Sequence, residues 1–423
     1  MTDSLNEGVE DQFTPVFEVA VTHDWLADLN LRVTTHDPAV DAPISSTLHY
    51  IGIWDAFMTR VFLDLLEASP DPVRVYDVGA NIGWYALVAS ATFRKRGRDG
   101  KVYAFEPGAQ NRAALSRSLA ENGLCDWVDV VPHAVSDFAG EGRLVRKDVN
   151  FGDYRLQSAL NPPSGPVADA QSISVVTLDG WRVENEAGLP TFIKMDIQAS
   201  EPMALSGFAQ SLAACPNVTL MLEWEPDIWS LDDALAPHGP FTLFQLDDLN
   251  HVLRPVDAAT LEAERATWGR HYFDVLAVRG PAATARVARV AARFNLGTLR
   301  FVGKDRGLVE RPNRLSRLIV ERAEAVFTPG PDARVAGAVI LDGRVFRLLG
   351  TEGLELVVKQ GESRVISRMT LSERDTIRLH LPADQGTLRL AFRCLGTGGE
   401  TERRASISHL TMRLPADLQT SPG

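Results

Sequence analysis

Cysteine is scarce in this chain. Only three cysteines occur among 423 residues, and Cys125, Cys215 and Cys394 lie far apart in the sequence. An odd number of cysteines without close spacing argues against a disulfide framework and against a metal site made of cysteine ligands. We therefore expect three buried, free thiols in a reducing compartment.

Long apolar runs are also missing. No run approaches the roughly 20 apolar residues that a helix needs to cross a bilayer. The first residues, Met1 to Glu7, are polar and acidic, which is unlike a signal peptide. Together these observations predict a cytoplasmic protein without a transmembrane segment.

Positive charge is in the minority. The chain has 43 lysines and arginines against 55 aspartates and glutamates, which gives a formal net charge of -12. Binding to nucleic-acid phosphates needs the opposite balance, so we expect no nucleic-acid partner. The hydrophobic fraction of 45% is that of an ordinary globular protein. The length allows two or three domains.

The most informative stretch of the sequence is Val73–Gly83. A short apolar run ends in Asp77, turns through Gly79, Asn81 and Gly83, and leads at once into a helical pattern. A strand, a tight glycine turn and a helix form the crevice in which α/β sheets hold a nucleotide. The spacing lacks the third glycine of the dinucleotide fingerprint, which disfavours a nicotinamide-dependent oxidoreductase.

A second strand is predicted to end at Glu106, where the run Lys101–Glu106 closes. A carboxylate at this place can accept hydrogen bonds from both hydroxyls of a ribose. The next helix is predicted over Ala109–Glu121, because Asn122-Gly123 is a common helix stop. The glycine turn, the acidic strand end and the helix stop together indicate a nucleotide-binding α/β domain.

Further strands alternate with helical segments and complete the predicted sheet. They are expected at 128–132, 192–196 and 218–223, with a closing pair at 241–246 and 272–278. We predict no helix within the closing pair, so its last strand should be antiparallel. The polar segment Arg146–Ser172 contains Asn161–Pro166. It is either a lid or acceptor loop beside the site or a disordered connector.

The sequence predicts four regions. Residues 1–70 should form N-terminal strands and a helix that pack on the catalytic domain, which spans 71–280. Residues 281–330 are predicted to be an arginine-rich linker, either a solvated helix or a contact for anionic lipid or acidic glycan. Residues 331–423 alternate apolar and polar side chains with a period of two and are predicted to form a β-sandwich accessory domain.

Five short motifs follow one another along the chain, namely Asp77–Gly83, Phe105–Pro107, Ala134–Asp137, Val176–Trp181 and Thr191–Glu201. In this order they resemble the FkbM-type family of class I S-adenosylmethionine-dependent methyltransferases. The resemblance covers about residues 45–280. The sequence differs from the usual family pattern at Ala199, where glycine is common, and at Gln198, which replaces a common acidic residue.

The resemblance implies the fold and the cofactor. The fold would be a Rossmann-like sheet, mostly parallel with one antiparallel strand, and the cofactor would be S-adenosyl-L-methionine. Its methionine end would be held by Asp77, Gly79, Asn81 and Gly83, and its ribose hydroxyls by Glu106.

The resemblance also places residues near the adenine and the methyl group. Ala134, with its neighbour His133, would lie near the adenine. Asp196 would lie next to the methyl group, and Glu223 would face the acceptor.

The implied reaction is methyl transfer to a hydroxyl of a glycan or a small glycosylated metabolite. An alcohol acceptor needs a base to take its proton, and Asp196, His133 and Glu223 are the candidates, in falling order. No metal-spaced cluster supports a metal ion. One alternative is a cofactor-binding recognition protein in a polysaccharide-assembly complex. The sequence does not predict the oligomeric state.

Overall fold

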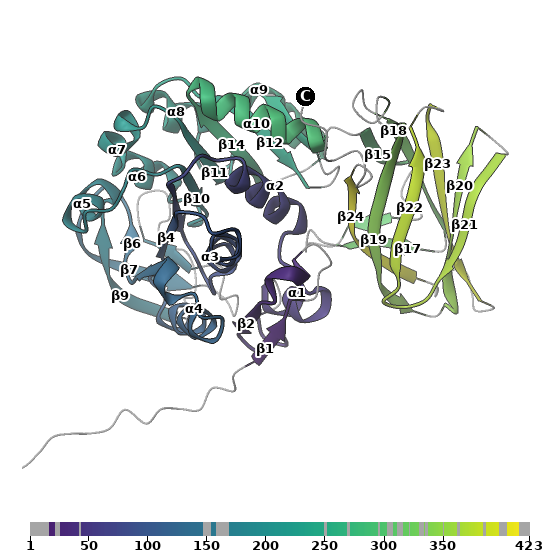
Figure 1. Cartoon of the computed structure of the whole chain (residues 1–423), viewed down its shortest axis with the longest axis horizontal. Helices are drawn as coiled ribbons and strands as arrows, with labels where there is room; N and C mark the ends of the chain where they lie inside the picture. Colours follow the sequence, from purple (N-terminus) through teal and green to yellow (C-terminus); the bar gives the residue numbers. More distant parts are fainter. Residues whose placement is uncertain are drawn as a thin grey trace, which may run out of the picture.

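The computed structural model describes most of the chain. The described residues are 17–21, 26–41, 44–146, 154–157, 169–248, 252–268, 271–294, 297–302, 308–310, 316–320, 322–329, 334, 337–349, 351–361, 364–383, 386–396 and 404–413. Figure 1 shows an α/β part on one side and a group of long strands from the C-terminal part of the chain on the other.

The α/β part is built on an eight-stranded sheet with the order β13-β12-β14-β11-β10-β3-β4-β5. Its strands are β3 (Val73–Val78), β4 (Gly100–Phe105), β5 (Val128–Val131), β10 (Phe192–Met195), β11 (Val218–Trp224), β12 (Thr242–Asp247), β13 (Val252–Val256) and β14 (Phe273–Arg279). The predicted strands are therefore present, and the five from β5 to β11 in this order are parallel.

The far edge of the sheet differs from the prediction of one antiparallel strand. β14 is antiparallel to both β11 and β12, and β13 is antiparallel to β12, so two strands are reversed. A helix, α9 (Ala258–Trp268), also lies in the connection where the sequence predicted none. The helix was not predicted because its amphipathic pattern is weak: among residues 258–265, whose burial is described, only Leu261 is fully buried.

Helices cover both faces of the sheet, and each face has its own hydrophobic core. One core includes side chains from α1 (Ile44–Ile51), α2 (Ala56–Glu67), α3 (Trp84–Arg96), α4 (Ala109–Glu121) and α10 (Pro281–Phe294). The other includes side chains from α5 (Leu178–Glu184), α6 (Glu201–Ser206), α7 (Ala209–Ala214), α8 (Leu231–Leu235) and α9. This doubly wound arrangement makes the sheet strands almost continuously apolar, as buried parallel strands are.

The N-terminal part packs on the first of these cores. It contains β1 (Phe17–Ala20), β2 (Arg32–Thr35) and the short 3-10 helix Ala27–Leu29. The chain has two helices, α1 and α2, where one amphipathic segment was predicted. The break falls at Gly52–Asp55, because Gly52 has φ 81° and Asp55 has φ 39°, and neither value continues an α-helix.

A small four-stranded sheet follows β5, with the order β6-β9-β7-β8. Its strands are β6 (Ala134–Val135), β7 (Gly140–Arg146), β8 (Tyr154–Leu156) and β9 (Asp169–Val176). Of the segment Arg146–Ser172, predicted as a lid or a connector, the described residues 146, 154–156 and 169–172 belong to these strands. Asn161–Pro166 lies outside the described residues.

The C-terminal part consists of two five-stranded antiparallel sheets, ordered β15-β18-β23-β20-β21 and β16-β17-β24-β19-β22. Buried side chains of both sheets share one hydrophobic core. The strands are β15 (Gly297–Val302), β16 (Leu308–Glu310), β17 (Ser316–Val320), β18 (Arg322–Pro329), β19 (Ala338–Leu349), β20 (Gly353–Gln360), β21 (Arg364–Leu371), β22 (Thr376–Pro382), β23 (Leu388–Leu395) and β24 (Arg404–Arg413).

The segment 281–330, predicted as an arginine-rich linker that forms a solvated helix or a contact for lipid or glycan, contains a helix followed by strands. Its first part is α10, which packs on the α/β core and buries Arg286. The ring of Phe294 meets that of Phe57 edge-on, with 5.3 Å between the ring centroids. The remainder of the segment contributes strands to the C-terminal sheets, since β18 pairs with β23 and β17 pairs with β24. Arginines such as Arg300, Arg317 and Arg322 interrupt the apolar residues of these strands in the sequence, which obscured the strand pattern.

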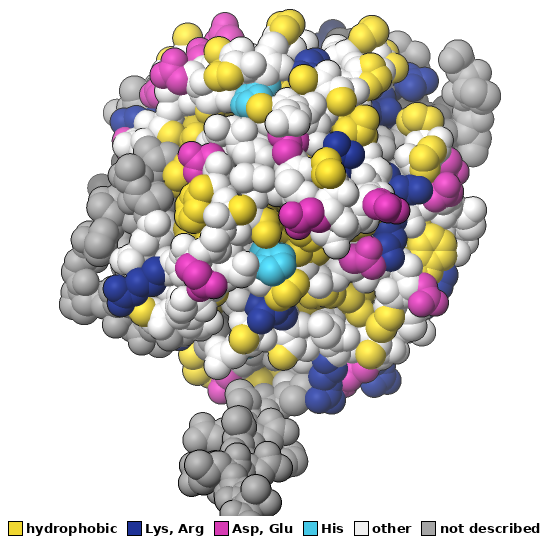
Figure 2. Space-filling model, turned by 90° about the vertical axis from the view of Figure 1, so that its left-hand side faces the viewer, with side chains coloured by type: hydrophobic (Ala, Val, Ile, Leu, Met, Phe, Trp, Pro, Cys, Tyr) yellow, Lys and Arg dark blue, Asp and Glu magenta, His cyan; other side chains and the backbone are white. Residues whose placement is uncertain are grey.

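The remaining expectations concern thiols and membrane helices. All three cysteines are free; Cys215 and Cys394 are buried, whereas Cys125 is exposed. Among the described residues, no helix is long and apolar enough to cross a membrane. On the face shown in Figure 2, acidic and basic side chains are mixed with hydrophobic ones.

Candidate active site

A cavity of about 320 Å³ opens at the carboxyl ends of the parallel strands. This is the edge at which open α/β sheets bind ligands. Seven of the nine residues predicted for the site line the cavity, and they come from five strands of the main sheet: six follow β3, β4, β5 or β10, and one lies near the end of β11. They are Gly79, Asn81, Glu106, His133, Ala134, Asp196 and Glu223. The other two, Asp77 and Gly83, lie next to the cavity wall but do not line it.

The turn after β3 has an unusual backbone. Gly79, Asn81 and Gly83 all have positive φ values, of 79°, 54° and 86°. A Cβ on Gly79 would collide with the carbonyl oxygen of Asp196, and one on Gly83 would collide with Leu115. The absence of a Cβ at these glycines therefore allows close packing of protein elements at the turn.

Asp77 is fully buried beneath this turn. Its nearest opposite charge is on Lys194, its register partner on the neighbouring strand β10. Burial raises the pKa of Asp77 to about 6, although the Lys194 ammonium pulls it down. The Asp77 carboxyl therefore acts on Lys194, whose pKa it helps to raise.

Glu106 is fixed at the end of β4 by the same turn. Its carboxylate accepts hydrogen bonds from the backbone N–H groups of Asn81 and Gly108, both at 2.8 Å, and from the Asn111 amide at 3.4 Å. Burial raises its pKa, and these hydrogen bonds oppose that effect. The turn after β3 and the carboxylate after β4 thus form one connected unit.

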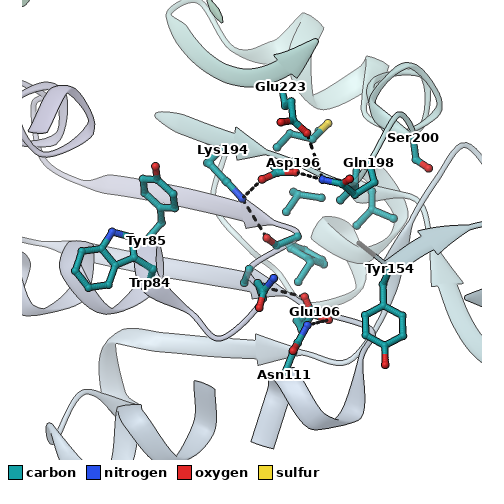
Figure 3. A pocket seen from close by; sticks show the side chains of 18 of the residues that line it. Trp84, Tyr85, Glu106, Asn111, Tyr154, Lys194, Asp196, Gln198, Ser200 and Glu223 are labelled. Carbon is teal, nitrogen blue, oxygen red and sulfur yellow. Dashed lines mark hydrogen bonds and ion pairs between the residues drawn. The ribbon is translucent and has the colours of Figure 1, made fainter. Parts of the chain in front are cut away.

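Asn111 is a site residue that the sequence did not reveal. It lies in the first turn of α4, lines the cavity and also bonds His36 through its amide oxygen at 2.7 Å. The N-terminal segment therefore helps to orient the groups around Glu106. Tyr154 of β8 lines the cavity beside them, and Figure 3 shows Glu106, Asn111 and Tyr154 at one end of the site.

Asp196 and Glu223 meet at the other end of the cavity. The side-chain amide of Gln198 donates to Asp196 Oδ1 at 2.9 Å and to Glu223 Oε2 at 3.2 Å, so it bridges the two carboxylates. Figure 3 shows this bridge and Lys194 beside it. The structure therefore brings together the two carboxylates that the sequence placed at separate strand ends.

The two departures from the family pattern take a special backbone conformation. Gln198 has φ 56° and Ala199 has φ 67°, in the left-handed region that costs a non-glycine residue about 1 kcal/mol or more. The preference for glycine at position 199 follows from this turn. Here the strained conformation places the Gln198 amide between Asp196 and Glu223.

Lys194 is the buried cation of the site, and the sequence analysis did not single it out. Its ammonium donates to the Gly79 carbonyl oxygen at 3.1 Å, lies 3.6 Å from Asp196 Oδ2 and sits over the Tyr85 ring at 5.5 Å. Burial alone would lower its pKa, but the charges of Asp196, Asp77 and Glu223 raise it. Lys194 is therefore held protonated.

His133 and Ala134 line the cavity after β5. The Nδ1 atom of His133 is buried and has no hydrogen-bond partner among the residues that the structure describes. It is available to a polar ligand atom. Within the same described residues, no three His, Cys, Asp or Glu side chains are grouped as a metal site would require.

Comparison with known proteins identifies the domain. Residues 77–245 match the family model of the methyltransferase FkbM domain. No curated protein matches the chain.

Several solved structures are distantly similar. The precorrin-6y C5,15-methyltransferase from Geobacter metallireducens is 11% identical, with 53% of this chain and 87% of that chain covered and a TM-score of 0.27. The METTL16 methyltransferase domain is 13% identical, with 52% of this chain and 66% of that chain covered and a TM-score of 0.30. A third similar structure is the CBM36-1 domain of a multidomain xylanase from the hindgut metagenome of Trinervitermes trinervoides. It is 10% identical, with 27% of this chain and 89% of that chain covered and a TM-score of 0.20. On the strength of the family match, residues 77–245 are a methyltransferase FkbM domain, the family that the sequence motifs predicted.

Proposed function

We propose that this protein transfers a methyl group from S-adenosylmethionine to a hydroxyl of a glycan or a small glycosylated metabolite. The observation that carries the proposal is the Glu106 carboxylate, which the Asn81 and Gly108 N–H groups hold at the end of the second parallel strand. When bound, the cofactor would supply a methyl group on a positively charged sulfur.

The residues around Glu106 fit this cofactor. Glu106 would accept hydrogen bonds from the two ribose hydroxyls. His133, whose buried Nδ1 has no hydrogen-bond partner among the described residues, would lie on the adenine side with Ala134. Gly79 and Asn81 would contact the methionine end. Because Asp77 and Gly83 do not line the cavity, they would act on that end by supporting the turn.

The acceptor end would supply the base. The acceptor oxygen would form its new bond to the methyl carbon, and the electron pair of the broken carbon–sulfur bond would leave with the sulfur. The acceptor proton would go to a base, for which we propose the Asp196 carboxylate, with His133 and Glu223 as alternatives. Positioning and proton removal are the usual sources of rate in such a displacement.

The C-terminal sheets are proposed to form a β-sandwich accessory domain. Their shared core supports this arrangement, since two sheets that pack face to face bury the alternate side chains of each strand. A role in holding a glycan acceptor is a further part of the proposal.

Two measurements test the proposed function. Calorimetric titration should show binding of S-adenosylmethionine and of its demethylated product. Radiolabelled S-adenosylmethionine should pass label to hydroxylated glycans or glycosides, and the label should survive base treatment that cleaves methyl esters. Absence of cofactor binding by the folded protein would exclude the proposal.

A further inference from the structure

The C-terminal part of the chain differs in charge from the α/β part. Residues 297–423 contain twenty lysines and arginines against fifteen aspartates and glutamates, whereas residues 1–296 contain twenty-three against forty. Such an asymmetry is typical of a chain whose basic part meets an anionic partner. The surface for this partner should then be a face of the C-terminal sheets on which cations gather.

One face of the sheet β15-β18-β23-β20-β21 carries such a group of cations. On β23, residues 388, 390, 392 and 394 are buried in the core that the two sheets share, so the alternate Arg389 and Arg393 point outward. The strand register places Lys359 of β20 and Arg368 of β21 on the same outer face. We call these four residues the basic face.

The basic face is open to solvent. The side chains of Arg368, Arg389 and Arg393 are 62%, 52% and 55% exposed. Figure 1 shows β20 and β21 on the side of the C-terminal part that is away from the α/β part, whereas β24 of the other sheet lies against α2 and α10. A large partner could therefore reach the basic face without meeting the α/β part.

Carboxylates compensate the basic face only in part. Glu324 pairs with Arg389 at 2.8 Å, and Glu355 is shared by Arg393 at 3.0 Å and Arg368 at 3.6 Å. No other acidic residue occurs in the sequences of β18, β20, β21 and β23. Four cations thus share two carboxylates, and the basic face keeps an excess of two positive charges.

The side chains between these cations are small and aliphatic. Val326 and Ala391 lie next to the cations in the strand register, as does Val357, and none of the described residues on this face is aromatic. Single-stranded nucleic acids are held by stacking of their bases on aromatic side chains, and membrane-surface elements insert Trp, Phe or Leu. A polymer that carries its negative charges on hydrophilic sugar rings needs neither kind of contact.

We propose that the basic face binds an anionic polysaccharide, a linear chain of sugars that carry carboxylates. Lys359 and Arg389 are register partners on neighbouring strands, and Arg368 follows on β21, so a chain that crosses these strands meets successive cations. Guanidinium groups bind carboxylates through two parallel hydrogen bonds. The inference goes beyond the proposed methyl transfer, because the basic face lies outside the cavity.

The test measures binding of the full-length protein to immobilised sodium alginate, a polymer of uronic acids, without any cofactor. Dextran serves as the neutral polymer. The chain as a whole has a formal net charge of -12, so general attraction to a polyanion does not arise, and binding needs a local basic surface. We expect the protein to bind alginate and not dextran. Added salt should weaken the binding, because it screens exposed charges.

Two variants locate the binding on the basic face. A triple variant with Lys359→Gln, Arg368→Gln and Arg389→Gln should bind alginate at least about tenfold more weakly, since three exposed charge contacts are lost. Thr370→Glu keeps every cation but adds a carboxylate to an exposed position beside Glu355, and it should also weaken binding.

The matched control removes three positive charges elsewhere. Lys95→Gln, Arg96→Gln and Arg117→Gln, combined in one protein, change exposed residues of α3 and α4. This variant has the same net charge as the triple variant of the basic face and should bind alginate as the wild type does.

Three results would overturn the inference: a wild type that does not bind alginate, equal losses of binding in the two triple variants, and unchanged binding by Thr370→Glu. Binding to vesicles of phosphatidylglycerol and phosphatidylcholine, or to duplex DNA, as tight as binding to alginate would assign the basic face to a different partner and would overturn it too. Because no cofactor is present, a failure of the proposed methyl transfer would leave these results unaffected.

Discussion

Lys194 and Asp77 lie opposite each other on neighbouring parallel strands, and both are buried. Lys194 also bonds the Gly79 carbonyl and approaches Asp196. One ammonium therefore links the turn after β3 with the Asp196 carboxylate. This link is the electrostatic centre of the site, and the following predictions begin with it.

Replacing Lys194 should destabilise the fold. Lys194→Met keeps the length of the side chain but leaves Asp77 and Asp196 without their cation. Removing one member of a buried ion pair costs about 3–5 kcal/mol, so urea denaturation should show a loss of this size. Lys95→Met, which breaks a surface pair with Asp28, should cost less than about 1 kcal/mol. Equal losses for the two variants would contradict the assigned role of Lys194.

The pKa of Asp77 predicts a pH dependence of stability. Its folded-state pKa is about 6 against an ordinary value of 3.8, so the folded protein holds this proton more tightly than the unfolded chain does. The contribution of Asp77 is present below pH 3.8 and is lost as the pH rises to about 6. This loss amounts to about 3 kcal/mol.

Asp77→Asn removes this titration. The wild type should therefore lose about 3 kcal/mol of unfolding free energy between acidic and neutral pH that the variant does not lose. The difference between the variant and the wild type should shift by this amount in favour of the variant. The exposed Asp99→Asn provides the control, since it should follow the wild type at every pH. A constant difference between Asp77→Asn and the wild type across this range would show that Asp77 does not have a raised pKa.

The C-terminal sheets should fold only when residues before 331 are included. β18 lies between β15 and β23, and its Ala325 and Phe327 are in the shared core. We expect a fragment of residues 297–413 to give a cooperative thermal transition. A fragment of residues 331–413 lacks four strands and should remain unfolded. Cooperative unfolding of the shorter fragment would refute this account of the domain boundary.

Asp196→Asn tests the proposed base. The substitution keeps the shape of the side chain and its place beside Gln198, but it removes the charge that would take the acceptor proton. Methyl transfer should fall by about 10²–10⁴-fold, the usual contribution of a general base, with little change in cofactor affinity. A rate within about threefold of the wild type would move the role to Glu223 or His133.

Most of the fold could be predicted from the sequence, because the strands around Asp77, Glu106 and Asp196 are short apolar runs that end in polar residues. The strands at 297–329 were missed, because their arginines interrupt the apolar alternation in the sequence. Helix α9 was missed because its apolar face is narrow.

The site was predictable where a motif marks a strand end and not where contacts come from distant segments. Gly79, Asn81 and Glu106 were found in this way, and the structure places them together. Asn111 and Tyr85 were missed, because a helix position shows nothing of the cavity that it faces. The position of Glu223 opposite Asp274 on β11 and β14 depends on the strand register, which the sequence does not reveal.

The cofactor site gives the most direct test of the central claim. Calorimetric titration should be carried out on the wild type, on Glu106→Ala and on Glu121→Gln, a control on the exposed side of α4. The Glu106→Ala variant loses the ribose hydrogen bonds, which are worth roughly 1.5–3 kcal/mol each. It should therefore bind S-adenosylmethionine at least about tenfold more weakly than the wild type, whereas the control should bind it with unchanged affinity. Unchanged affinity in a folded Glu106→Ala variant, or no binding by the wild type, would contradict the account.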